Sequence, residues 1–188
     1  MENEIVLASA SPRRRELMKL ITENYEVRAS DVDETVPPCV PKDKSAEYVA
    51  KIKAEAAKKS ENEVIIGCDT IVVTPMGEIL GKPRDRDDCR RMLRALSGKT
   101  HNVCTGVCII YGSEVRTFTE TTEVVFDALT DSDIESYMDT GEPFDKAGGY
   151  GIQGKGALLV TGIIGDYFNV VGLPVNHLYS ELRHMGVI

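Results

Sequence analysis

The sequence lacks tryptophan, and aromatic residues make up only 6% of its 188 positions. It also lacks a basic excess, because 22 Lys and Arg against 30 Asp and Glu give a net charge of −8. Base stacking needs aromatic side chains and phosphate backbones need cations, so both shortages argue against a nucleic-acid-binding protein. An anionic substrate would need a local positive site within this acidic chain.

Long apolar runs are missing as well. No stretch approaches the roughly 18 consecutive apolar residues of a membrane helix, and the acidic start at 1–4 lacks the basic segment of a signal peptide. We therefore expect a cytoplasmic protein without a membrane partner. The five cysteines form no Cys-x-x-Cys pair and the three histidines form no metal-binding pair, which favours structural thiols over a metal or redox centre.

Length and pattern predict an α/β fold in one domain, residues 1–188. A chain of this mass buries about 70% of its unfolded surface, enough for a hydrophobic core. Strand and helix patterns alternate irregularly and include one hairpin, so we expect a mixed, twisted β-sheet with flanking helices. The expected strands are 5–8, 25–29, 64–67, 71–73, 101–111, 114–126 and 158–164; the expected helices are 13–20, 46–59, 85–96, 130–138 and one opened by Pro174; 141–156 is expected as a glycine-rich loop.

A basic corner follows the first expected strand. Ser11 and Pro12 predict a helix start, with the Ser11 hydroxyl as N-cap. The next three residues, 13–15, are all arginine, although the first turn of a helix prefers acidic side chains. Backbone N–H groups, serine hydroxyls and guanidinium groups could converge there on phosphate oxygens. The alternative is a solvated basic turn.

Asp69 stands inside the otherwise apolar run 64–73. A carboxylate there is costly unless it is paired, hydrogen-bonded or bound to a metal. It could cap a turn or pair with an arginine, or it could bind a divalent ion or take a proton from water. Asp31, Asp33 and Glu34 in a proline-bounded loop offer further oxygen ligands for Mg²⁺ or Mn²⁺, or they form a solvated loop.

The glycine-dense segment 141–154 indicates either close backbone approach to a ligand or a flexible loop. Gln153 places an amide donor and acceptor where they could contact the edge of a base. Lys82, between Gly81 and Pro83, is a candidate phosphate contact.

Taken together, several segments resemble the Maf family of nucleotide pyrophosphatases. They are LASASPRRRELM, GCDTIVV, GKPRD, LSGKTHNVCTGV, GEPFDKAGGYGIQG and NVVGLP, in family order over nearly the whole chain. The resemblance implies a fold related to the inosine-triphosphate pyrophosphatase superfamily, two lobes around a cleft, and usually a homodimer. It also implies hydrolysis of nucleoside triphosphates to monophosphate and pyrophosphate with a divalent metal, Mg²⁺ or Mn²⁺. DKAGGYGIQG resembles the branch that acts on dTTP and UTP.

The resemblance also assigns roles to individual residues. Asp69 matches the proton acceptor and, with Glu34, the metal site. Lys82 matches a catalytic residue of the cleft. The residues expected to bind substrate or select it are Ser9, Arg13, Arg14, Thr70 and Gln153.

One helix departs from the family pattern. The lysine usual in the family falls on Ala56 here, and Lys53 lies about one helical turn earlier. Whether Lys53 takes its place is left open by the sequence. Two other functions also stay open: a pyrophosphatase for modified purine nucleotides such as 7-methyl-GTP, and a nucleotide-binding regulator of cell division with little catalysis.

Overall fold

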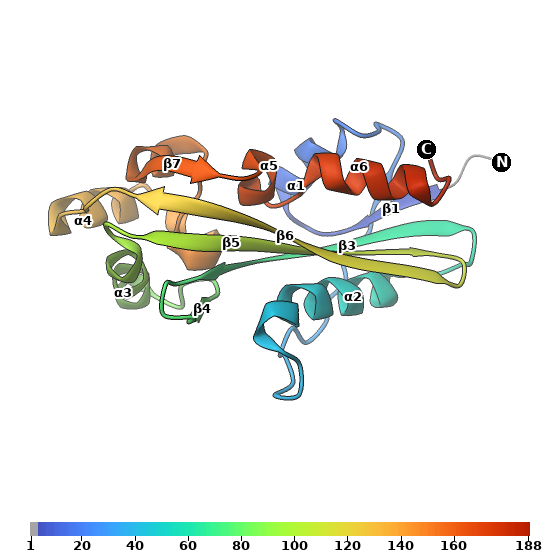
Figure 1. The fold of residues 1–188 in the computed structure, drawn as a ribbon, viewed down its shortest axis with the longest axis horizontal. Coiled ribbons are helices and arrows are strands. Elements are labelled where there is room, and N and C mark those ends of the chain that lie inside the picture. The colour runs from blue at the N-terminus through green and yellow to red at the C-terminus, as the bar shows by residue number, and fades with distance from the viewer. Residues whose placement is uncertain (1–3) are drawn as a thin grey trace. The chain divides into compact units, whose positions relative to one another are not determined.

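A computed structural model describes residues 4–188, so most of the acidic start and the first three residues of the predicted domain lie outside the described part. The α/β class is confirmed. The strands form one mixed sheet in the order β2-β1-β3-β5-β6-β7, with β4 paired to β3 (Figure 1). The strands are β1 (Glu4–Ala8), β2 (Glu26–Val27), β3 (Glu63–Val73), β4 (Ile79–Leu80), β5 (Thr100–Tyr111), β6 (Glu114–Phe126) and β7 (Val160–Ile164).

Helices flank the sheet, as expected. The α-helices are α1 (Pro12–Met18), α2 (Ser45–Ala57), α3 (Arg86–Leu96), α4 (Asp131–Asp139), α5 (Tyr167–Val171) and α6 (Val175–His184). Four short 3-10 helices are η1 (Lys42–Lys44), η2 (Glu142–Asp145), η3 (Ala147–Gly149) and η4 (Gly154–Leu159). Among the described residues, no helix combines the length and apolar character that crossing a bilayer requires.

The chain divides into two compact units, which correspond to the two expected lobes. Unit 1 consists of Met1–Asp69, Thr105–Glu120 and Gly172–Ile188, and unit 2 of Thr70–Cys104 and Thr121–Val171. Each unit has its own apolar core. Strands β1, β3 and β5 and helix α2 supply one core of unit 1, and α3, α4 and the strand segments around them supply that of unit 2.

Two glycines bring α2 directly onto the sheet in unit 1. A Cβ atom at Gly67 would lie 2.0 Å from the carbonyl oxygen of Ala50, and one at Gly106 would lie 2.2 Å from the carbonyl carbon of Ala46. No side chain fits either position, so the helix backbone rests on β3 and β5. This close contact fixes which face of α2 is turned to the sheet, and with it the place of Lys53.

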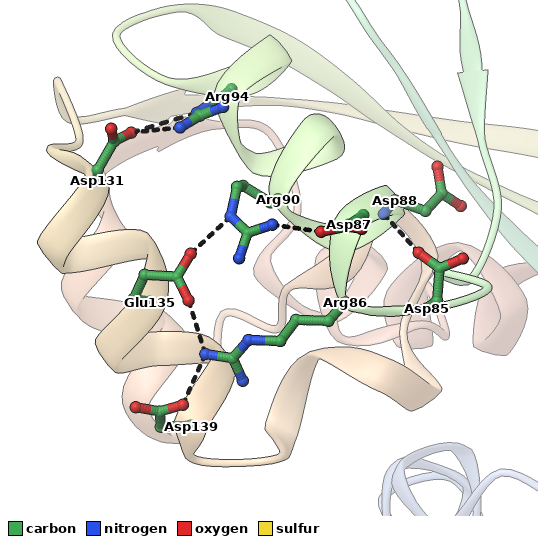
Figure 2. A network of polar contacts seen from close by, with 9 residues as sticks. All are labelled: Asp85, Arg86, Asp87, Asp88, Arg90, Arg94, Asp131, Glu135 and Asp139. Carbon is green, nitrogen blue, oxygen red and sulfur yellow. Dashed lines mark hydrogen bonds and ion pairs between the residues drawn. The ribbon is translucent and has the colours of Figure 1, made fainter.

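An ion-pair network joins α3 to α4 in unit 2 (Figure 2). The pairs, at 2.6–2.8 Å, are Arg86 with Glu135 and Asp139, Arg90 with Glu135, and Arg94 with Asp131. Arg90 and Arg86 lower the pKa of Glu135 from 4.5 to about 2. The contribution of the Glu135 carboxylate to the free energy of unfolding is therefore complete above pH 4.5 and is lost as the pH falls towards 2. Partial exposure keeps each pair weak.

Most expected elements are confirmed, including the long hairpin of β5 and β6 and the Thr130–Asp133 capping box at α4. Four details differ. Ser11 occupies the N-cap of α1, but its hydroxyl makes no capping bond; its N–H donates instead to Ser9 Oγ. The two short strands expected around Asp69 are one strand, β3. The expected loop 141–156 contains η2, η3 and the start of η4, and α5 and β4 were not expected.

His101 lies in the core of unit 2, where only 2% of it is exposed. Its Nε2 lies 2.6 Å from the Tyr150 hydroxyl, and its ring packs edge-on against Phe126. Its Nδ1 is buried and has no hydrogen-bond partner within residues 4–188. Burial lowers the pKa of His101 from 6.5 to about 4, because a charged imidazole there would be desolvated.

The low pKa of His101 predicts a loss of stability in mild acid. In the unfolded chain His101 is protonated below about pH 6.5. In the folded chain it stays neutral until the pH falls to about 4. The free energy of unfolding is therefore expected to fall by about 3 kcal/mol across this window. Urea unfolding at a series of pH values measures it. His101→Gln should remove this component, and His184→Gln, at an exposed histidine, should retain it. Parallel profiles of the two variants would contradict the assignment.

Candidate active site

A lysine between two carboxylates marks the candidate catalytic centre in unit 1. Lys53 Nζ lies 2.8 Å from Asp69 Oδ1 and 2.9 Å from Glu34 Oε1. The Lys53 and Asp69 side chains are only 12% and 16% exposed, whereas that of Glu34 is 56% exposed. One ammonium group therefore compensates two acids that the sequence places 35 residues apart, one on β3 and one in the loop before η1.

This arrangement explains how β3 tolerates Asp69. The strand is buried from its first residue to Cys68 and half-buried at Asp69, so the carboxylate needs a partner. A lysine on α2 supplies it, not the arginine or turn N–H that the sequence suggested. Lys53 was the functional candidate that the sequence left undecided. Its signal in the sequence was its position one helical turn before Ala56, and the structure adds its contacts with Asp69 and Glu34.

The same residues suit a divalent metal of the expected kind. Within residues 4–188, no group of three or more His, Cys, Asp and Glu side chains is placed to hold a metal ion. Mg²⁺, however, commonly takes only one or two carboxylates from the protein and completes its coordination with water and substrate phosphates. The Asp69 and Glu34 carboxylates, held close by one ammonium, match that donor set. The metal itself stays a prediction.

Arg14 connects its own segment to two distant segments of unit 1. Its Nε donates to the carbonyl oxygen of Gly172 at 2.8 Å, and its Nη1 donates to that of Cys68 at 3.0 Å and to Ser9 Oγ at 3.3 Å. The Cys68 carbonyl immediately precedes Asp69. Arg14 and Ser9 thus support the backbone of the candidate centre, and their expected contact with phosphate stays a prediction.

The remaining predicted residues are Arg13, Thr70, Lys82 and Gln153. Arg13 is half-buried on α1, and Thr70 is half-buried and follows Asp69 on β3. Lys82 and Gln153 are exposed in unit 2. There the N–H of Gly148 donates to the carbonyl oxygen of Gly81 at 2.9 Å, so the segments that carry Lys82 and Gln153 are tied together. The structure thus gathers Ser9, Arg14, Glu34 and Asp69 in unit 1, with Lys53 added.

Comparisons with known proteins show what the whole chain is similar to. The family profile described as Maf-like protein matches residues 4–185. The dTTP/UTP pyrophosphatase of Halalkalibacterium halodurans is 49% identical over 183 residues, which cover 97% of this chain and 96% of that protein. That of Thermosipho africanus is 50% identical over 185 residues, which cover 98% and 95%.

A solved structure gives the same result for the fold. The Ham1 protein of Staphylococcus aureus superposes with a TM-score of 0.58 at 17% identity, covering 97% of this chain and 99% of that one. At this identity the likeness shows the fold alone, and it confirms the expected one. Because the family profile spans nearly every described residue and the relatives match over nearly their whole length, the chain belongs to the Maf family.

Proposed function

We propose that this protein hydrolyses dTTP and UTP to the monophosphate and pyrophosphate. The observation that carries the proposal is the near-full-length identity of 49% and 50% to two proteins named dTTP/UTP pyrophosphatase. The cluster of Asp69, Lys53 and Glu34 supports it, because it supplies a carboxylate for proton transfer beside a second carboxylate and a cation.

In the proposed mechanism, water attacks the α-phosphorus and pyrophosphate leaves. Asp69 orients this water and accepts its proton. Asp69 and Glu34 would hold Mg²⁺ or Mn²⁺, which supplies charge stabilisation to the phosphates when bound. Lys53 keeps both carboxylates in place, and Arg14 and Ser9 hold the backbone at Cys68. Arg13 and Lys82 bind phosphate oxygens, so that positioning and charge account for most of the rate.

The base is selected by Gln153, with Arg13 and Thr70 assisting. Thymine and uracil present an O4 acceptor beside an N3–H donor, and a carboxamide complements both. The same amide turned over would suit cytosine, so its orientation decides specificity. Acceptance of both dTTP and UTP means little demand at the ribose 2′ position. The cytoplasmic location and the homodimer expected from the sequence belong to the proposal.

A substrate panel with product identification tests this function. With Mg²⁺ or Mn²⁺, dTTP and UTP should be hydrolysed to monophosphate and pyrophosphate with kcat/KM values well above those for dCTP, purine triphosphates and 7-methyl-GTP. Comparable values for all nucleotides would contradict the specificity. A preference for 7-methyl-GTP would establish the modified-purine alternative, and nucleotide binding without release of pyrophosphate would establish the regulator.

A further inference from the structure

The carboxylate of Glu142 caps the turn that carries Gln153. Glu142 begins η2, and its Oε1 and Oε2 accept the N–H of Lys155 at 3.1 and 3.0 Å; Oε2 also accepts the N–H of Gly156 at 3.4 Å. These N–H groups belong to the first turn of η4, where they have no partner within the helix. Gln153 is the residue immediately before η4. Glu142 therefore fixes the backbone just after Gln153.

The backbone before Gln153 is fixed as well. The N–H of Gly151 donates to the Tyr137 hydroxyl at 3.2 Å, and Tyr137 is buried in the core of unit 2. A Cβ atom at Gly156 would lie 2.0 Å from the carbonyl oxygen of Gly151, so the two ends of the turn are in close contact. The turn 151–156 is thus held on both sides, with exposed Gln153 between.

The glycine at position 154 shows how closely the carboxylate fits this turn. Gly154 has φ +67°, and a Cβ atom there would lie 2.8 Å from Glu142 Oε1. Only glycine adopts this conformation readily and leaves room for the acid. Within the described residues, the Gln153 amide has no hydrogen bond to another group, so its placement depends on the backbone that carries it.

We propose that Glu142 is a positioning residue for nucleotide selection: its carboxylate holds the 151–156 turn so that the Gln153 amide meets the base in one orientation. The inference rests on the proposed function. Misplacement of a binding group by about 1 Å is enough to weaken a reaction strongly. A loosened turn lets the amide contact thymine and cytosine in several ways, so discrimination falls before catalysis is lost.

Glu142→Gln tests this inference. The amide keeps the size of the side chain, but it replaces one of the two acceptor oxygens with an NH₂ group, which cannot accept a hydrogen bond from the backbone N–H groups of Lys155 and Gly156. The ratio of kcat/KM for dTTP to that for dCTP is expected to fall about tenfold, mainly through a higher KM for dTTP. The Lys155 and Gly156 amides should exchange hydrogen faster. Asp139→Asn removes the same charge from the nearby end of α4, outside this turn, and should change neither quantity.

A second variant disturbs the contact between Glu142 and the turn 151–156 by a change in the turn. Gly154→Ala places a methyl group against the carboxylate and should reduce the same ratio, even if Glu142→Gln does not fold. An unchanged ratio in active, folded variants would overturn the inference and leave the proposed function intact. A wild-type protein that hydrolyses neither dTTP nor UTP would overturn both.

Discussion

Asp69→Asn is expected to lower kcat for dTTP about 10²–10⁴-fold while the affinity for nucleotide changes little. The asparagine keeps the size of the side chain. Its amide oxygen can still accept a hydrogen bond from the Lys53 ammonium, which in the parent lies 2.8 Å from Asp69 Oδ1. It cannot accept a proton from water, and it is a poorer ligand for Mg²⁺. Steady-state kinetics gives kcat, and calorimetry with a nonhydrolysable dTTP analogue gives the affinity.

The matched control for this variant is Asp43→Asn. Asp43 is an exposed acid of η1 in unit 1, so the substitution makes the same change of charge away from the candidate centre. Its kcat should equal that of the parent. If Asp69→Asn retains activity within tenfold of the parent, Asp69 takes no part in the chemistry.

Lys53→Met is the second substitution with a large expected effect. Without the ammonium, the Asp69 and Glu34 carboxylates repel each other, and the reacting phosphate loses a nearby cation. We expect kcat to fall about 10²-fold. The uncompensated acids should also attract a divalent cation more strongly, so Mn²⁺ should bind several-fold more tightly. Kinetics with varied metal concentration and Mn²⁺ calorimetry measure the two effects separately.

Two further variants make this result specific. Lys51→Met removes a half-exposed lysine from the same helix, where it pairs only loosely with Glu55 at 3.8 Å, and should leave both quantities unchanged. Lys53→Ala combined with Ala56→Lys moves the cation to the position usual in the family and should recover part of the kcat lost in Lys53→Ala. A Lys53→Met protein with parental kcat and Mn²⁺ affinity would refute the role of Lys53.

Most of the fold could be predicted because its elements carry strong local signals. The apolar runs of β1 and β3, the alternating hairpin of β5 and β6, and the Thr130–Asp133 capping box each depend on neighbouring residues. The short elements could not be predicted in this way. β4 has two residues and α5 has five, too few to show a period, and both form because the surrounding chain holds them.

The candidate site shows the same division. Asp69 could be found because a carboxylate in an apolar strand is unusual, but its partner could not. Helix α2 is rich in alanine, so its apolar face is hard to recognise from the sequence. Two glycines on the sheet, Gly67 of β3 and Gly106 of β5, determine which face of the helix packs against it. Likewise, the Arg14 contact to Gly172 joins residues 158 positions apart, a separation over which local pattern carries no information.

The order of residues in unit 1 has a consequence for biosynthesis. All of unit 2 is encoded before residue 172, whereas unit 1 needs Gly172–Ile188 to be complete, including the fully buried Leu178 and Leu182. A ribosome adds about 5–20 residues per second, so residues 172–188 are made after all of unit 2, and unit 1 is completed only once unit 2 has been synthesised.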